Sequence, residues 1–197
     1  MKNNTKEMFL HTASTLFAIK GYHATGINEI LKKSQAPKGS LYYYFPHGKE
    51  QLAIESLELT AQKIYAEIKK TLAKYDDPIQ GLQQHLQQLA QKIQQDIDNP
   101  REDKDNISIS LIALETFFSN DPIRNRCKEI FSQMQSIYTD NFIKYGYDAE
   151  TANILAMNAV IMTEGAIILS VTQKNTLPLR QLADNLPLLF NLDVKSR

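Results

Sequence analysis

Apolar residues recur along most of the chain at intervals of three and four positions, the spacing that places them on one face of an α-helix. No segment alternates between apolar and polar residues as a half-buried strand would. The pattern therefore predicts an all-α fold. The predicted helices cover residues 4–20, 25–33, 38–45, 48 to about 75, 77–97, 107–119, 120–145, 148 to about 173, and 176 onward.

Several of these helices carry residues suited to their ends. Thr25 is expected to cap the second helix, because its hydroxyl can accept from the free backbone N–H groups of the first turn. Asp77 before Pro78, and Asp148 further on, are expected to cap later helices in the same way. Residues 98–105 are predicted to form a charged loop.

The short helix over residues 38–45 has an unusual polar face. Leu41 and Phe45 lie one turn apart and can anchor it to a core. Glycine costs a helix about 1 kcal/mol relative to alanine, so its use here is to let a partner approach the backbone. We expect this face to grip a polyanion; the alternative is a packing helix, which explains its lysine-glycine-serine start poorly. The face carries Lys38, Gly39, Ser40, Tyr42, Tyr43 and Tyr44.

The long helix that begins at Gly48 is expected to connect a small N-terminal domain to the body of the protein. Lys49 lies beside the free N–H groups of its first turn, which makes it a candidate phosphate contact. His47 and Glu50 have a spacing seen in metal sites, but no further ligand is nearby in the sequence. We therefore predict neither a metal site nor a cofactor.

The charge balance differs between the two parts of the chain. Net charge is zero over 197 residues, yet residues 1–50 hold seven lysines against three glutamates, a balance of +4. The remainder is accordingly at −4. This asymmetry favours an N-terminal surface for nucleic acid and an acidic body.

The sequence also bears on compartment and membrane. The single cysteine, Cys127, excludes an intramolecular disulfide and suits a reducing cytoplasm; we interpret it as a small buried hydrophobe rather than a redox sensor. The N-terminus lacks the apolar core of a signal peptide. The most apolar run, 152–171, is interrupted by polar residues, so no membrane span is expected.

Residues 9–52 resemble the helix-turn-helix domain of the TetR family of bacterial transcriptional regulators. The matching pieces are Leu16-Phe17, Gly21-Tyr22, Thr25, Ile27, Ile30, Lys38-Gly39-Ser40-Leu41-Tyr42, Phe45 and Lys49-Glu50. The resemblance implies a DNA-binding domain over 1–47 and a helical ligand-binding and dimerisation domain over 48–197. It also implies a pseudo-palindromic double-stranded operator as partner. The DNA contacts expected on this basis are Thr25, Lys38, Gly39, Ser40, Tyr42, Tyr43, Tyr44 and Lys49.

The sequence departs from the family pattern in two places. Gln35 occupies the turn position usually held by glycine. The link from Pro46 to Lys49 is one residue longer than usual, a form similar to the LmrA/YxaF-type branch, whose members repress transporter or detoxification genes. The resemblance therefore implies a repressor that a small molecule releases from its operator.

The last two predicted helices need a partner. Residues 152–171 are apolar almost all the way round, so one face must be covered by something outside their own domain. The final helix adds leucines on more than one side. The simplest cover is the same pair of helices from a second subunit, which is the arrangement that TetR-type proteins use. We therefore predict a homodimer.

Aromatic and methionine residues in the body suggest a cavity for a planar or aromatic inducer, although plain core packing would explain the same pattern. Glu164 lies on an apolar face, where an unpaired carboxylate is costly; it is expected either at the dimer seam or against a ligand. The predicted lining set is Phe117, Phe118, Phe131, Met134, Tyr138, Met157, Ile161 and Glu164.

Two other classes of protein compete with the DNA-binding prediction. One is a helical enzyme or lipid carrier, and the other is a protein–protein adaptor whose tyrosine-rich helix binds a partner. No nucleophile–base pair, phosphate-cradling glycine loop or metal cluster is present in the sequence to support catalysis. We therefore predict that the protein is not an enzyme and has no catalytic residues.

Overall fold

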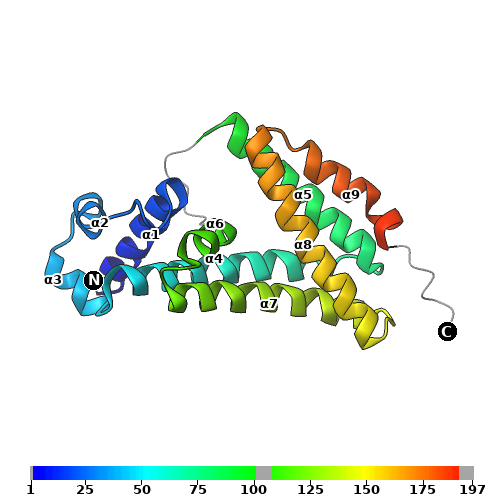
Figure 1. Cartoon of the computed structure of the whole chain (residues 1–197), viewed down its shortest axis with the longest axis horizontal. Helices are drawn as coiled ribbons and strands as arrows, with labels where there is room; N and C mark the ends of the chain where they lie inside the picture. Colours follow the sequence, from blue (N-terminus) through cyan, green and yellow to red (C-terminus); the bar gives the residue numbers. More distant parts are fainter. Residues whose placement is uncertain (1, 101–107, 191–197) are drawn as a thin grey trace. The chain divides into compact units, whose positions relative to one another are not determined.

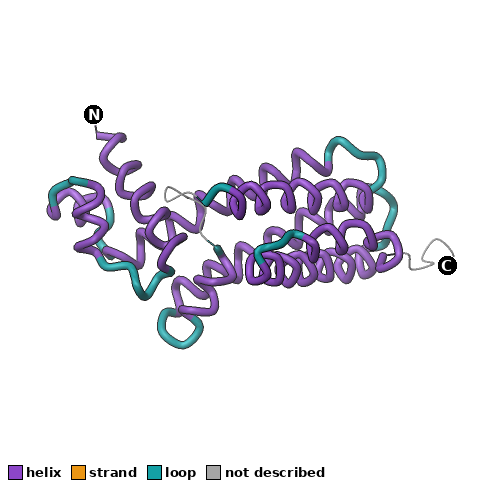
Figure 2. The backbone as a smooth tube through the Cα atoms, turned by 90° about the horizontal axis from the view of Figure 1, so that it is seen from above, coloured by secondary structure: helices purple, strands orange, loops and turns teal. Residues whose placement is uncertain are grey.

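The computed structural model describes residues 2–100 and 108–190. These residues form helices joined by loops, and none of them lies in a strand, which confirms the predicted all-α class (Figure 2). The helices are α1 (Lys2–Lys20), α2 (Ile27–Ser34), α3 (Lys38–Tyr44), α4 (Gly48–Leu72), α5 (Pro78–Asp98), α6 (Ile109–Thr116), α7 (Asp121–Lys144), α8 (Ala149–Gln173) and α9 (Leu177–Phe190).

Two of the predicted caps are confirmed and one is wrong. Asp77 Oδ1 accepts from the N–H of Ile79 at 2.8 Å, and Asp148 Oδ1 accepts from the N–H of Thr151 at 3.0 Å. The N-cap of α2 is Gly26, not Thr25. The Thr25 hydroxyl instead donates to the carbonyl of Gly21 at 2.8 Å, because the end of α1 offers it a free acceptor within the buried turn.

The chain divides into two compact units, which are described separately. The first comprises Met1–Lys63 and Arg101–Ile130, and the second comprises Ile64–Pro100 and Phe131–Arg197. Helices α4 and α7 each contribute to both units. This division differs from the expected domains, 1–47 and 48–197, since α6 and the first part of α7 group with the N-terminal helices. The expected boundary concerns function and stays a prediction.

The first unit packs α1, α2 and α3 around an aromatic core (Figure 1). Phe9 of α1 meets Phe45 edge to face, with ring centroids 6.3 Å apart. Leu41 and Phe45 are both fully buried, as the predicted anchoring of the short helix requires. Cys127 is buried in this unit as well, and burial raises the pKa of its thiol to about 11, which supports its interpretation as a small hydrophobe.

The second unit is organised around α5, α8 and α9, which pack side by side (Figure 1). Leu179 and Leu186 of α9 are buried, and Gln83 of α5 donates to the carbonyl of Ala183 at 2.9 Å. Phe142 of α7 stacks on Phe190 at the end of α9, at a centroid distance of 6.2 Å. Part of the leucine set on α9 therefore stabilises its own subunit.

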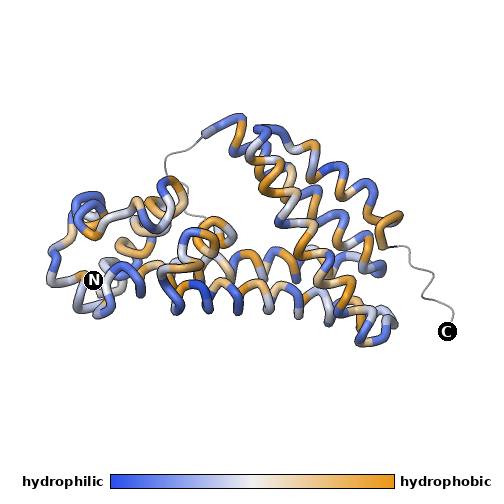
Figure 3. The backbone as a smooth tube through the Cα atoms, viewed as in Figure 1, coloured by the Kyte–Doolittle hydropathy of each residue, from blue (hydrophilic) through white to orange (hydrophobic). Residues whose placement is uncertain are grey.

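Helix α8 has two different faces. Its inward face consists mainly of small residues, which let neighbouring helices approach closely. Its exposed face carries apolar residues along most of its length, and hydrophobic positions recur along the helix in Figure 3. Among the described helices, α8 is long and apolar enough to cross a membrane by length and composition only, a test that the core helix of a soluble protein also meets. The exposed apolar residues of α8 are Ile154, Met157, Ile161, Ile168, Leu169 and Val171.

Candidate nucleic-acid interface

Helix α3 separates an anchoring face from an open polar face. Pro37 takes an extended conformation and forms the N-cap, so the helix starts at Lys38 as the sequence predicts. Leu41 and Phe45 point into the core, while Tyr42 and Tyr43 are 44% and 70% exposed. Burial of two apolar side chains on one side thus leaves the polar face available for a partner.

Gly39 leaves the backbone of α3 open. A Cβ built at this residue would meet nothing within 4 Å, so the surface there is bare backbone. Lys38 beside it is exposed, and Ser40 and Tyr44 are half-buried. A polyanion can therefore approach the main chain of α3 between a cation and hydroxyl groups.

The turn between α2 and α3 keeps its left-handed geometry without glycine. Gln35 is the C-cap of α2 and has φ of 52° and ψ of 25°. A residue with a Cβ pays about 1 kcal/mol or more for this conformation. Gln35 thus adopts the same left-handed conformation that a glycine would, at a cost in backbone strain, and the turn is unchanged.

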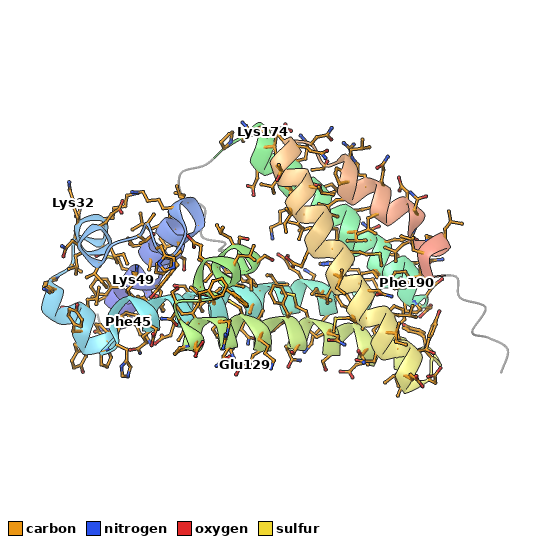
Figure 4. The ribbon with its side chains drawn as sticks, in the orientation of Figure 1. Lys32, Phe45, Lys49, Glu129, Lys174 and Phe190 are labelled. Carbon is orange, nitrogen blue, oxygen red and sulfur yellow. The ribbon has the colours of Figure 1, made fainter. Side chains whose placement is uncertain are left out.

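Lys49 ties the start of α4 to the turn between α1 and α2. Its Nζ donates to the carbonyls of Tyr22 and Thr25, both at 3.0 Å, and lies 4.2 Å from the centroid of the Tyr22 ring. Burial lowers the pKa of Lys49, and the nearby Glu115 opposes that shift. An ammonium has three donors, so one N–H remains for a phosphate. Lys49 is labelled in Figure 4, and the sequence did not predict this internal role.

Neighbouring side chains extend or constrain this surface. Lys32 and Lys33 are exposed at the end of α2, and Lys32 projects outward (Figure 4). Thr25 is fully buried, so its side chain offers no surface to DNA in this conformation. Glu50 accepts from the side-chain amide of Asn120 at 2.7 Å.

The predicted lining set falls into separate settings. Phe117 and Phe118, after α6 in the first unit, are 51% and 96% exposed. Met157 and Ile161 lie on the exposed face of α8, and Phe131 and Glu164 are half-buried. Only Met134 and Tyr138 are buried. The four exposed residues therefore do not line the interior of their own unit: Phe117, Phe118, Met157 and Ile161.

The second unit buries several polar side chains, two of which, His85 and Tyr138, lie close to each other. The ring of His85 lies 6.4 Å from that of Tyr138, and burial lowers the pKa of His85 to about 4. Burial, with Glu164 contributing, raises the pKa of Tyr138. Thr163 Oγ1 is buried without a hydrogen-bond partner. His85 and Thr163 are not evident as site residues from the sequence, because each lies among apolar residues of an ordinary helical stripe.

The chain matches two families of known proteins. Residues 9–55 match the family of bacterial regulatory proteins, tetR family, and residues 78–185 match the C-terminal domain of LmrA/YxaF-like transcriptional regulators. The second match spans more than half of the chain.

Individual relatives agree with both matches. The chain is 37% identical to the uncharacterised helix-turn-helix regulator YxaF of Bacillus subtilis (strain 168), over 95% of this chain and 96% of that one. It is 35% identical to the regulator LmrA of the same strain, over 93% and 95%. A TetR regulator from Legionella pneumophila shares the fold, with a TM-score of 0.76 at 20% identity over 94% of this chain and 97% of that one. The chain therefore belongs to the TetR family of bacterial transcriptional regulators, in its LmrA/YxaF-like group, and is a helix-turn-helix DNA-binding regulator rather than an enzyme.

Proposed function

We propose that this protein is a cytoplasmic, ligand-responsive repressor that binds a pseudo-palindromic operator as a homodimer. The observation that carries the proposal is the geometry of α3, whose buried Leu41 and Phe45 hold an exposed polar face outward. A helix presented in this way fits the major groove, and two of them in a dimer read two half-sites. The proposed contacts are Lys38, Gly39, Ser40, Tyr42, Tyr43, Tyr44 and the remaining N–H of Lys49.

The exposed apolar face of α8 supports the homodimer. Ile154 and Ile161 are 50% and 58% exposed, and they lie two turns apart on one side of the helix. On α9, Leu188 and Leu189 add exposed apolar surface next to the buried Leu186. Self-complementary pairing of α8 and α9 with a second copy would remove this surface from water.

The buried polar groups of the second unit support a ligand site. The imidazole of His85 lies beside the phenol of Tyr138, and Met134 and Thr163 are also buried in this unit. A planar or aromatic molecule with hydrogen-bonding groups suits such surroundings better than a sugar or a phosphate. Binding would release DNA by favouring a conformation whose two α3 helices no longer match the half-sites. Membership of the LmrA/YxaF-like group supports a transporter or detoxification gene as the target.

The test is protection of DNA upstream of the protein's own gene, measured with and without candidate aromatic compounds. We expect a protected pseudo-palindrome whose affinity falls steeply with added salt, because phosphate contacts release counterions. A candidate compound that acts as inducer should abolish the protection. Binding of a protein or lipid partner with no salt-sensitive DNA binding would instead support the adaptor or carrier.

A further inference from the structure

The turn between α1 and α2 is held by a residue from a distant part of the chain. Tyr22 donates its backbone N–H to Oε2 of Glu115, near the end of α6, at 2.6 Å. The two residues are 93 positions apart in the sequence, and both belong to the first compact unit. An N–H bound to a carboxylate is a charge-assisted hydrogen bond, which is stronger than a bond between neutral groups.

Neighbouring contacts complete this junction. The Nε2 of His23 lies 2.9 Å from the carbonyl oxygen of Glu115 and 3.1 Å from the hydroxyl of Ser119. Gly21 has φ of +78°, a conformation that favours glycine, and a Cβ added there would meet the carboxylate of Glu115 in its present position. Glu115 therefore lies directly against the turn.

Lys49 binds the same peptide segment from the other side. Glu115 accepts the N–H of Tyr22, while Lys49 donates to the carbonyl of Tyr22. The charge of Glu115 also acts on Lys49, as the opposing effect on its pKa shows. The start of α4 and the end of α6 thus grip one residue, Tyr22, which leads directly into the helix-turn-helix.

We propose that Glu115 is a positioning residue for operator binding, fixing the helix-turn-helix against α6 through Tyr22. The proposal rests on the proposed function. Glu115 binds no phosphate, because it is an anion whose carboxylate is directed at the turn. Glu115 restricts the conformations of the helix-turn-helix before DNA binds, so less conformational entropy is lost on binding. Binding to two half-sites orders two helix-turn-helix units at once, so it depends on this restriction more than binding to one half-site does.

Glu115→Gln tests the proposal, since glutamine retains the shape and an acceptor but loses the charge. Affinity is measured by fluorescence anisotropy on duplexes containing either both half-sites or one half-site of the protected upstream region. We expect affinity for the full site to fall about tenfold and that for the single half-site only about threefold, because DNA then has to order one helix-turn-helix instead of two. The salt slope should equal that of the wild type, whereas losing a phosphate contact would lower it by about 1.

Hydrogen exchange at the Tyr22 amide gives a second readout. Its protection should fall in Glu115→Gln, while amides in α5 and α8 keep theirs, a difference that a general loss of stability would not produce. Glu67→Gln is the matched control, because Glu67 pairs with Lys92 at 2.9 Å on the exposed surface of the second unit. It should change neither the affinities nor the exchange of Tyr22.

Three results would overturn the proposal: wild-type affinity for the full site, an equal loss on both duplexes, or unchanged exchange at Tyr22. If Glu115→Gln does not fold by circular dichroism, Glu115→Asp is measured in the same way, because it keeps the charge but shortens the reach to Tyr22. A wild-type protein that binds neither duplex would refute the proposed function itself.

Discussion

His85 should make the stability of this protein fall as the solution is mildly acidified. Its side chain is buried in α5, and burial lowers its pKa from the ordinary value of 6.5 to about 4. The unfolded chain therefore binds a proton at a pH where the folded chain does not. Stability is fully present above the unfolded pKa and is lost as the pH falls toward the folded one.

The expected size follows from the two pKa values. Between about pH 7 and about pH 5, the free energy of unfolding should drop by about 2 kcal/mol on account of His85 alone. Most carboxylates stay ionised in that interval, so the contribution of the imidazole can be separated.

Urea unfolding at several pH values, followed by circular dichroism, measures this contribution. His85→Gln should remove most of the pH dependence in the interval, whereas His11→Gln, at an exposed position on α1, should keep it. If His85→Gln retained the full pH dependence of the wild type, the imidazole would not be buried in its neutral form and the reasoning would fail.

Three further changes test other parts of the molecule. Ile161→Arg brings a charge onto the exposed face of α8 and should convert the proposed dimer to monomer in sedimentation. Leu59→Arg, at a similarly exposed residue on α4, should not. A monomeric wild type at micromolar concentration would refute the proposed dimer interface. Lys49→Ala removes the donor to two carbonyls, so it should lower the free energy of unfolding in urea by about 1–2 kcal/mol. It should also lower the salt slope of DNA binding by about 1. An unchanged slope would mean that Lys49 contacts no phosphate. Gln35→Gly relieves the left-handed conformation and should raise stability by about 0.5–1 kcal/mol; a loss would show that the glutamine side chain makes a stabilising contact.

The helices and the orientation of α3 could be predicted from the amino-acid sequence alone. The spacing of apolar residues predicted each helix to within a few residues. Asp77 and Asp148 were recognised as caps because a cap bonds to backbone only two or three positions away. Leu41 and Phe45 were recognised as anchors because residues one turn apart share a face. These features depend on near neighbours in the chain, and near neighbours are what a sequence pattern records.

The tertiary structure decided which distant groups meet. Nothing in the local pattern indicates that Glu115 accepts from Tyr22, or that Lys49 donates to carbonyls ahead of α2. Thr25 was expected to accept hydrogen bonds as a cap, but its hydroxyl donates to the carbonyl of Gly21 at the end of α1, and Gly26 is the N-cap. Phe118 was expected in a cavity and is almost fully exposed. A polar or aromatic side chain can form hydrogen bonds or packing contacts with many different partners. Only the folded chain determines which partner comes close enough.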